Sequence, residues 1–247
     1  MPLKLTLNYS PNFNSKKRRK KDVRFIILHY TGMRSENAAI KRLTSIQSQV
    51  ASHYLITRSG KIINLVPELY IAWHAGISSW KSFNSLNKNS IGIEITNPGH
   101  QFGYKKFSKE QIKSLIYLIK FLIKKYKINK NNILGHSDIA PDRKKDPGEK
   151  FPWEYLAKNN ISIWHTLDKQ KLRKLRNKKC NKVMKNLFLN KLFRIGYAKK
   201  FKNNVKKNRY LVFVVKAFQR RFRPELVNGK IDKECLLISK NLTYYKA

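Results

Sequence analysis

Two histidines and one aspartate have the residue types and the placement of a metal centre. The apolar, branched run at 23–30 (VRFIILHY) predicts a buried strand with His29 near its carboxyl end. A second short strand at 132–134 leads to His136, and Asp146 follows ten positions later. Because side chains at strand ends can reach a cleft, we expect these three residues to meet there.

Two imidazoles and a carboxylate are the ligand set of catalytic zinc sites, which keep a fourth position open for water. Structural zinc sites more often have four protein ligands and use cysteine, and this set has neither feature. Asp138 is nearer to His136 in the sequence than Asp146 and is an alternative ligand on proximity alone. The same spacing is compatible with structural histidines and a plain Asp-Pro-Gly turn, so the residues indicate a zinc centre without requiring one.

The elements that would position these residues alternate between strands and helices. The segment 52–66 predicts two strands around a Ser-Gly turn, and 91–97 (IGIEITN) predicts another strand with Glu94 in its middle. Ser108 and Gln111 form a capping-box pattern at the start of a helix whose apolar residues recur at helical spacing. Strands and helices mix up to about residue 160, which predicts an α/β layer architecture.

The C-terminal part of the chain has a different pattern. Residues 161–180 are strongly basic and have few long apolar stretches, which favours a linker. Helical periodicity returns at 183–195 and 211–222, and Asp232 can cap a third helix after an Asn-Gly turn. We therefore expect three short helices to form a small, separate all-α domain.

Positive charge is the most unusual property of the composition. The 247 residues include 54 Lys and Arg against 14 Asp and Glu, which gives a formal net charge of +40. Such a charge attracts polyanions, including nucleic acid, anionic membrane surfaces and acidic cell-wall polymers. Because Lys, Asn and Ile are abundant in every segment, a compositional bias explains the charge better than a patch built for one ligand. Nucleic acid is therefore expected only as a non-specific partner.

Other features of the composition limit the class of protein further. A hydrophobic content of 41% is enough for a folded core and excludes a fully disordered chain. Cys180 and Cys235 are far apart and form no CxxC pair, so we expect free thiols. No run approaches the ~20 apolar residues of a membrane span, and the polar N-terminal stretch lacks the apolar core of a signal peptide. These observations alone predict a cytoplasmic protein.

Five sequence blocks, in their order along the chain, resemble a known enzyme family. They are LHYTG at 28–32, ASHYLI at 51–56, AWHAG at 72–76, IGIEI at 91–95 and GHSDIAPDRKKDPGEKFPW at 135–153. Together they are similar to the zinc-dependent N-acetylmuramoyl-L-alanine amidases, which share their fold with the peptidoglycan-recognition proteins. The resemblance implies a mixed central sheet flanked by helices.

The resemblance also implies a set of metal ligands. Positions matching His29, His136 and Asp146 hold the zinc ion in this family, so Asp138 becomes a residue that shapes the loop. The histidines of the ASHYLI and AWHAG blocks are expected to be structural and near the cleft, respectively, and neither is expected to bind the metal.

Two catalytic residues follow from the same resemblance. Glu94 matches the family's general acid and base, and Lys144 matches a residue that stabilises the transition state. The physical interpretation agrees, because a carboxylate in an apolar strand is costly to bury without a task or partner. A cation beside a metal can likewise share the charge of a developing oxyanion. The alternatives are a rim-exposed Glu94 and a solvated Lys144, flanked by Arg143 and Lys145.

The C-terminal part resembles the small three-helix peptidoglycan-binding domain. The similarity rests on LFRIGY at 192–197 and on the AFQRRF and NGKID motifs within 210–242, although the first helix is unusually rich in lysine. An amidase domain followed by such a domain is most similar to the AmiD type of the family. The predicted organisation is a basic flexible tail at 1–21, a zinc amidase domain at 22–160, a basic linker at 161–180 and a peptidoglycan-binding-like helical domain at 181–247.

We therefore expect a hydrolase with Zn²⁺ as cofactor and peptidoglycan or its muropeptide fragments as substrate. It would cleave the amide bond between N-acetylmuramic acid and L-alanine. The alternatives are a peptidoglycan-binding protein without catalysis, which usually lacks a zinc ligand, and a basic protein that binds nucleic acid. The family resemblance allows a location in the cell envelope as well as in the cytoplasm.

Overall fold

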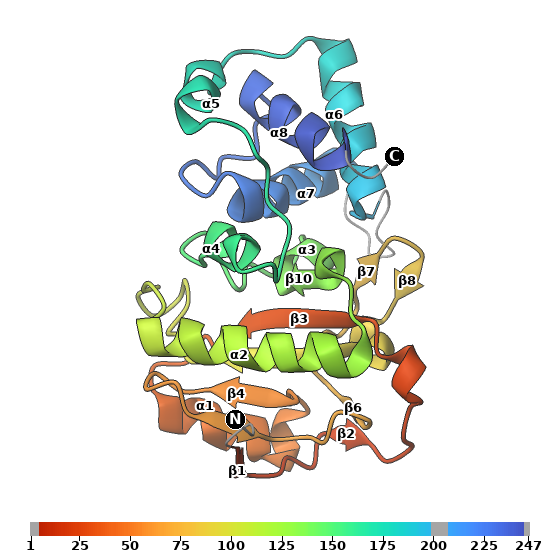
Figure 1. Cartoon of the computed structure of the whole chain (residues 1–247), viewed down its shortest axis with the longest axis vertical. Coiled ribbons are helices and arrows are strands. Elements are labelled where there is room, and N and C mark those ends of the chain that lie inside the picture. Colours follow the sequence, from red (N-terminus) through yellow and green to blue (C-terminus); the bar gives the residue numbers. More distant parts are fainter. Residues whose placement is uncertain (1–4, 199–206, 245–247) are drawn as a thin grey trace.

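A six-stranded sheet lies at the centre of the protein, and its strand order is β1-β5-β4-β9-β3-β10 (Figure 1). The computed structural model describes residues 5–198 and 207–244. Strands β4 and β5 pair antiparallel, whereas the other neighbouring strands of this sheet are parallel. The sheet is therefore mixed, as the family resemblance implies.

The predicted strands and helices are all present, together with others, including α1 and α5, that the sequence patterns did not predict. The central sheet contains β1 (Thr6–Leu7), β3 (Phe25–Tyr30), β4 (Tyr54–Ile56), β5 (Ile62–Asn64), β9 (Ser90–Ile95) and β10 (Ile133–Gly135). Two small antiparallel pairs are formed by β2 (Phe13–Asn14) with β6 (Ile71–Ala72) and by β7 (Ser79–Trp80) with β8 (Phe83–Asn84). The helices are α1 (Glu36–Thr44), α2 (Lys109–Tyr126), α3 (His136–Ile139), α4 (Trp153–Lys158), α5 (Lys169–Leu175), α6 (Lys182–Ile195), α7 (Lys207–Phe222) and α8 (Lys233–Tyr244).

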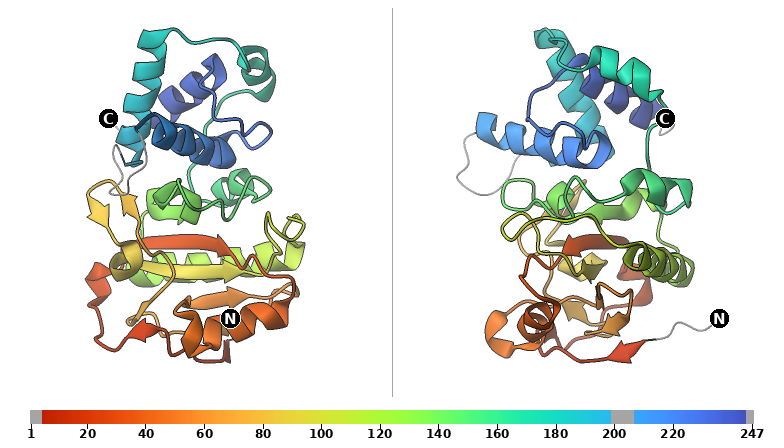
Figure 2. Two further views of the ribbon diagram at one scale, coloured as in Figure 1. Left: turned by 180° about the vertical axis from the view of Figure 1, so that it is seen from behind. Right: turned by 90° about the vertical axis from the view of Figure 1, so that its left-hand side faces the viewer.

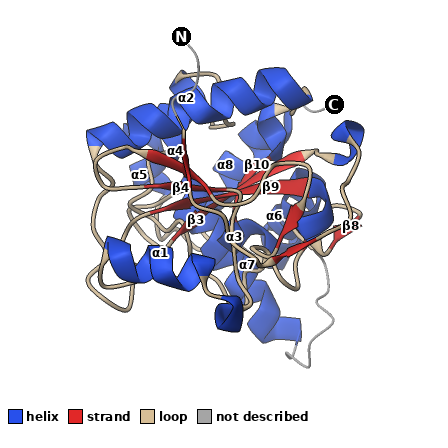
Figure 3. Cartoon of the chain, turned by 90° about the horizontal axis from the view of Figure 1, so that it is seen from below, coloured by secondary structure: helices blue, strands red, loops and turns tan. Residues whose placement is uncertain are grey.

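Alternating side chains of the central strands bury both faces of the sheet. Ile26 and Leu28 of β3 belong to a core that includes α2, whereas Phe25 and Ile27 belong to a second core. Successive residues of a strand point to opposite faces, which explains why this strand is a continuous apolar run. Figure 3 shows α1 and α2 on opposite sides of the sheet.

Helix α2 begins as the capping box predicts. Ser108 Oγ accepts a hydrogen bond from the backbone N–H of Gln111 at 3.1 Å, and Gln111 Oε1 accepts one from the backbone N–H of Ser108 at 3.0 Å. The apolar stripe of the helix, including Leu115 and Ile119, is fully buried against the sheet. This helix covers one face of the sheet and holds the strands that carry the candidate site.

The C-terminal helices stack beyond the β10 edge, at the end of the molecule opposite β1 (Figures 1 and 2). Phe188 and Leu192 of α6 and Phe218 of α7 share one continuous core with Phe25 and Leu134 of the sheet. Helices α6, α7 and α8 form as the periodicity predicts, and Asp232 Oδ1 caps α8 by accepting from the N–H of Cys235 at 2.9 Å. The helical part is thus packed on the sheet, not separated from it.

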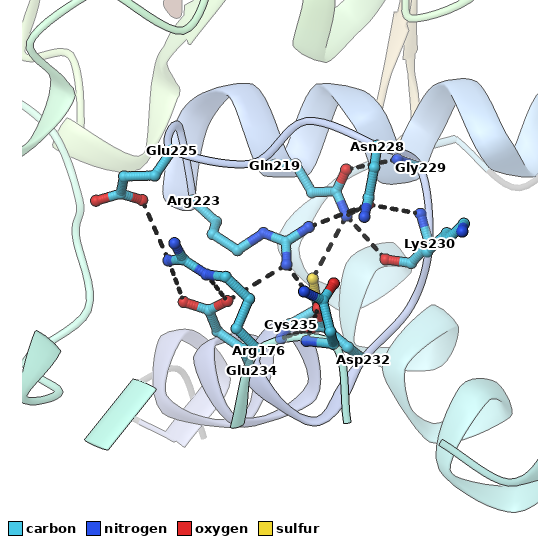
Figure 4. Close-up of polar contacts among 11 residues, drawn as sticks. Arg176, Gln219, Arg223, Glu225, Asn228, Gly229, Lys230, Asp232, Glu234 and Cys235 are labelled. Carbon is cyan, nitrogen blue, oxygen red and sulfur yellow. Dashed lines mark hydrogen bonds and ion pairs between the residues drawn. The ribbon is translucent and has the colours of Figure 1, made fainter. Parts of the chain in front are cut away.

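A buried ionic network holds the C-terminal helices together (Figure 4). The Arg223 guanidinium, which is 1% exposed, lies 2.6 Å from Asp232 and 3.3 Å from Glu234. Arg176 makes two hydrogen bonds of 2.7 Å to the Glu234 carboxylate. Gln219 binds the turn at 228–230 through Asn228 Oδ1, the carbonyl of residue 230 and the N–H of residue 229. Gln219 of the AFQRRF motif and Asp232 of the NGKID motif therefore have structural partners within the C-terminal helices and turn. Arg221 of AFQRRF instead pairs with Asp138 of α3.

The predicted flexible tail at 1–21 is wrong for residues 5–21. Strand β1 pairs in parallel with β5, and β2 pairs with β6. Arg18 is buried and donates hydrogen bonds to the carbonyl oxygens of Glu68, Asn87 and Ser90. Burial lowers the pKa of Arg18 to about 10, and the backbone acceptors compensate for the loss of water around its charge.

The predicted linker at 161–180 is also more ordered than its composition suggests. Helix α5 forms within it, and Leu172 is buried in the core of the C-terminal helices. Arg176 forms an ion pair with Glu234, and the backbone of Lys179 forms an isolated antiparallel β-bridge with that of Asp232. Long basic side chains can keep their charges in water while the rest of the segment packs. A high content of basic residues is therefore compatible with a packed helix, and the prediction of a linker from composition missed α5.

Two further expectations concern cysteines and membranes. Cys180 and Cys235 are buried free thiols. Among the residues that the structure describes, none of the helices has the length and apolar character needed to cross a membrane.

Candidate metal centre and active site

The two histidines come from the ends of adjacent parallel strands. His29 is 1% exposed and is the second-to-last residue of β3, which pairs in parallel with β10. His136 follows directly after β10 and begins α3. Parallel neighbouring strands bring their carboxyl ends to one edge of the sheet, so the two imidazoles meet with ring centroids 4.5 Å apart.

A short return of the chain brings Asp146 to the same place. The N–H of Ser137 donates to the carbonyl oxygen of Asp146 at 2.9 Å, which fixes the loop against α3. Gly135 leaves room for this approach, because a Cβ there would lie 2.7 Å from Pro147. The glycine before His136 and the proline after Asp146 therefore form one packed corner.

Three ligand atoms converge at this corner. His29 Nδ1 lies 2.9 Å from His136 Nδ1, and Asp146 Oδ2 lies 3.0 Å from each of these nitrogens. Among the residues that the structure describes, this is the group of His, Cys, Asp and Glu side chains that lie close enough together to hold a metal ion.

The hydrogen bond on the far side of His136 supports a metal at this corner. Its Nε2 lies 3.1 Å from the carbonyl oxygen of Ala75, which can only accept, so the proton of a neutral imidazole is on Nε2. Nδ1 then directs a lone pair at the other ligand atoms. Such an arrangement of a ligand nitrogen inside and a carbonyl outside is typical of metal-binding histidines, and the three residues fit a divalent cation.

Electrostatics favour the unprotonated forms of these ligands. Burial, and then the neighbouring His136, lower the pKa of His29 to about 4, although the Asp146 carboxylate opposes the shift. Burial alone would raise the pKa of Asp146, but His136 and His29 hold it well below its usual range. A neutral imidazole and an ionised carboxylate are the forms that bind metals.

Glu94 lies beside this cluster on the neighbouring strand. It is directly opposite His29 in the register of β3 and β9, and it lines the same cleft. Its Oε2 atom is buried and has no hydrogen-bond partner within residues 5–198 and 207–244. Burial, and then the charge of Asp146, raise the pKa of Glu94 to about 8, while Lys144 opposes the shift. A carboxyl group held in this way is poised to exchange a proton.

The three cations of the RKK run have different positions. Arg143 donates hydrogen bonds to the carbonyl oxygens of Ala75 and Ile77, so it joins the ligand loop to the AWHAG segment. Lys144 is half-buried and lines the cleft, and its charge acts on both His29 and Glu94. Lys145 is exposed at the same cleft. The structure thus distinguishes Lys144 from its two neighbours.

The cleft around these residues has a volume of about 820 Å³. Arg34 and Arg42 add positive charge to its lining, and the aromatic rings of Trp73 and Phe102 are partly exposed there. The Arg34 guanidinium lies over the Phe102 ring, 5.0 Å from its centroid. A cleft of this size and charge suits an elongated anionic ligand.

The other two histidines differ in role. His53 is fully buried, accepts a hydrogen bond from the N–H of Gly92 and contacts the carbonyl oxygen of Tyr70, as expected of a structural residue. His74 lines the cleft, and its Nδ1 lies 3.1 Å from Nε2 of His29. The contact between His74 and His29 was not predicted from the sequence, although the AWHAG block could have indicated it.

Asp138, the alternative ligand, is used elsewhere. Its carboxylate accepts hydrogen bonds from the N–H of Gly135 at 2.9 Å and from the Tyr197 hydroxyl at 2.7 Å, and it pairs with Arg221 at 2.7 Å. It therefore shapes the turn before His136, and it also joins that turn to the C-terminal helices. The second role depends on residues far away in the sequence.

The fold and this cleft together define a class of protein, an α/β domain in which three side chains at the sheet edge could hold a metal ion. The sequence matches the family described as N-acetylmuramoyl-L-alanine amidase over residues 19–149. N-acetylmuramoyl-L-alanine amidase AmiD of Escherichia coli is 37% identical over 232 residues, which cover 89% of this chain and 82% of that protein. The chain therefore belongs to the N-acetylmuramoyl-L-alanine amidase family.

Solved structures give the same result. The complex of E. coli AmiD with anhydro-N-acetylmuramic acid-L-Ala-D-gamma-Glu-L-Lys has a TM-score of 0.78 and 36% identity, and the match covers 91% of this chain and 90% of that one. AmpDh3 of Pseudomonas aeruginosa has a TM-score of 0.78 and 33% identity over 99% of this chain and 100% of its own. The family resemblance and the mixed-sheet fold are therefore confirmed.

Proposed function

We propose that this protein is a zinc-dependent hydrolase of the amide bond between N-acetylmuramic acid and the L-alanine of the stem peptide. The observation that supports this most directly is the convergence of His29 Nδ1, His136 Nδ1 and Asp146 Oδ2 within 3.0 Å of one another. They lie in the cleft of a chain that belongs to an amidase family.

His29, His136 and Asp146 would hold the metal ion. Two imidazoles and one carboxylate are a ligand set of catalytic zinc, which when bound polarises a carbonyl group and lowers the pKa of water. The outer N–H of His136 is bound to the Ala75 carbonyl, which holds that ring in the orientation required of a ligand.

Glu94 would move the proton in both halves of the reaction. A cation at the neighbouring ligands favours the ionised carboxylate, which accepts a proton from the attacking water. The same carboxyl group then delivers the proton to the departing alanine nitrogen, so that the leaving group is a neutral amine. The free, buried Oε2 atom and the raised pKa of Glu94 suit both transfers.

Lys144 would stabilise the charge that develops on the scissile carbonyl oxygen. Lys144 lines the same cleft as Asp146, which follows it two positions later in the chain. A cation stabilises a developing negative charge more strongly in a site that excludes water than in bulk water. The mechanism needs no covalent enzyme intermediate.

The substrate would be a muramyl peptide. Acidic stem peptides carry carboxylates that the cationic lining, including Arg34, Arg42 and Lys145, can attract. E. coli AmiD has been solved in complex with an anhydro-muramyl tripeptide as its substrate, and AmpDh3 has been solved with an anhydromuramic pentapeptide. We extend this substrate class to the present chain.

Digestion of purified peptidoglycan, with products identified by mass spectrometry, tests this proposal. We expect free stem peptides that begin with the amine of L-alanine, and we expect their release to stop after chelation and to return with added zinc. Binding to peptidoglycan without any product would instead support the non-catalytic alternative. Cleavage in the glycan strand would contradict the proposal.

A further inference from the structure

The outer nitrogen of His29 has an unusual partner. The outer nitrogen of His136 binds a carbonyl oxygen, but Nε2 of His29 lies 3.1 Å from Nδ1 of another imidazole, that of His74. Nε2 of His74 in turn lies 3.1 Å from the hydroxyl of Ser90, and this hydroxyl donates to the carbonyl oxygen of Leu86 at 2.6 Å. The four residues of this series, His29, His74, Ser90 and Leu86, are all buried.

The Leu86 carbonyl determines which group donates in each hydrogen bond of the series that runs from Leu86 through Ser90 and His74 to His29. A carbonyl oxygen can only accept, so the single hydroxyl proton of Ser90 is held by Leu86. Ser90 Oγ can then only accept from His74, which places the proton of a neutral His74 on Nε2. Nδ1 of His74 therefore accepts from His29, and the proton of His29 is on Nε2.

We propose that His74 and Ser90 are positioning residues that set the tautomer of His29. With its proton held on Nε2, His29 presents the lone pair of Nδ1 to the cluster formed with His136 and Asp146. The proposal rests on the metal centre inferred above. It adds that the Leu86 carbonyl, three hydrogen bonds away from Nδ1, determines whether this nitrogen is free to bind the metal.

Neighbouring residues hold His74 and Ser90, the two middle members of this hydrogen-bonded relay, in place. The side-chain oxygen of Asn87 accepts from the N–H of His74 at 3.2 Å and from that of Ala75 at 2.7 Å. The carbonyl oxygen of Ser90 accepts from the buried Arg18 guanidinium at 2.7 Å. The strand glycine Gly92 provides the space for the His74 ring, because a Cβ there would lie 2.5 Å from Cγ of His74. The ring therefore has little freedom to turn away from His29.

The tautomers can be measured directly in the unmodified protein. Long-range ¹H–¹⁵N correlation spectra of the metal-free protein distinguish a protonated from an unprotonated imidazole nitrogen. We expect His29 and His74 both to have the proton on Nε2. A proton on Nδ1 of His74 would overturn the proposal, and this result does not depend on whether any variant folds.

Ser90→Ala tests the relay by removing its acceptor. His74 can then place its proton on Nδ1 and donate to His29, which moves the proton of His29 to the metal-binding nitrogen. Loss of such an outer contact lowers metal affinity by roughly 10- to 100-fold, and we expect this loss for zinc in competition with a chromophoric chelator.

Ser239→Ala is the matched control. Ser239 is also fully buried and donates its hydroxyl to a carbonyl, that of Leu236, within the C-terminal helices. We expect its zinc affinity to stay within about twofold of the parent, because Ser239 is not a hydrogen-bond partner of any residue of the cluster. Equal zinc affinity of the two variants would overturn the relay. Because both readouts are independent of turnover, an inactive enzyme with the expected tautomers and affinities would refute the proposed function alone.

Discussion

Arg221 Nη1 lies 2.7 Å from Asp138 Oδ2, and both side chains are at most 3% exposed. The same guanidinium donates to the carbonyl oxygen of Ile133 at 2.9 Å and lies over the Trp153 ring, 4.4 Å from its centroid. Asp138 in turn binds the N–H of Gly135. Arg221 of α7 therefore binds the start of β10 directly and its end through Asp138, and β10 is the strand that leads into His136.

Arg221→Met should destabilise the whole protein. The substitution leaves the Asp138 carboxylate buried without its cation, and breaking a buried pair in this way typically costs about 3–5 kcal/mol. Urea unfolding followed by circular dichroism measures the difference. The double variant Asp138→Asn/Arg221→Met should recover part of the loss because no charge is left unpaired. Equal stability of parent and single variant would show that the ion pair does not hold α7 to the sheet.

Glu94→Gln should stabilise the metal-free protein, and more so at higher pH. The pKa of Glu94 is raised from 4.5 to about 8 in the folded state. Between these values the unfolded chain ionises while the folded one stays protonated, so the parent loses stability as the pH rises. The glutamine variant has no such loss. We expect similar stabilities at pH 4.5 and an advantage of about 2 kcal/mol for the variant at pH 8.5.

Urea unfolding of chelated samples at both pH values measures this advantage. The expected difference in the free energy of unfolding is smaller than the full pKa shift of Glu94 would give, because part of its side chain reaches the cleft. An advantage that does not change with pH would contradict the raised pKa of Glu94.

Gly92→Ala should weaken zinc binding. The added methyl group would lie 2.5 Å from Cγ of His74, and the backbone at this position is not left-handed, so the effect comes from lost space. Displacement of His74 breaks its contact with His29, and overpacking of this kind typically costs about 1–3 kcal/mol of stability. Zinc competition and thermal unfolding test both effects. A variant with the zinc affinity of the parent would show that the ring is not confined by Gly92.

Lys144→Gln should lower kcat with little change in KM. Loss of a group that binds the developing oxyanion typically reduces the rate about 10²- to 10³-fold. Lys145→Gln is the matched control, because Lys145 lines the same cleft but is exposed. Steady-state kinetics on a muramyl tripeptide compare the two variants. Equal reductions would indicate a general effect of positive charge and no specific role for Lys144.

The positions of His29 and His136 could be predicted because each ends a short apolar strand, and parallel strands bring their ends together. The family blocks then favoured Asp146 over Asp138. Proximity in the sequence could not decide this point, because Asp138 is engaged by Tyr197 and by Arg221, 83 positions away. Only the folded chain shows that partner.

The errors have a common physical cause. Arg18 lies in the run KKRRKK, and nothing local distinguishes it from its solvated neighbours. Its burial depends on carbonyl oxygens of residues 50 to 72 positions away. The same is true of Ser90, whose role follows from hydrogen bonds to His74 and Leu86. Patterns of hydrophobicity predict elements, but they do not indicate which polar side chain finds a buried partner.

Helix α1 was missed for a different reason. Its apolar stripe is short, with Ala39 and Leu43 as its buried residues, and its remaining positions are mostly polar. Ser35 caps it by accepting from the N–H of Ala38 at 3.1 Å. Ser35 could have indicated the start of this helix, but the hydrophobic periodicity that follows it is too weak to predict a helix.

Hydrolysis of an anhydro-muramyl tripeptide in H₂¹⁸O tests the central claim most directly. Cleavage of the predicted amide places one ¹⁸O atom on the lactyl carboxylate of the muramic acid product and none on the released L-alanyl peptide. We expect this labelling pattern from the zinc-loaded protein and no products after chelation. Label in the peptide product, or product formation that is unchanged by chelation, would contradict the assignment of this cleft as a metal-dependent amidase site.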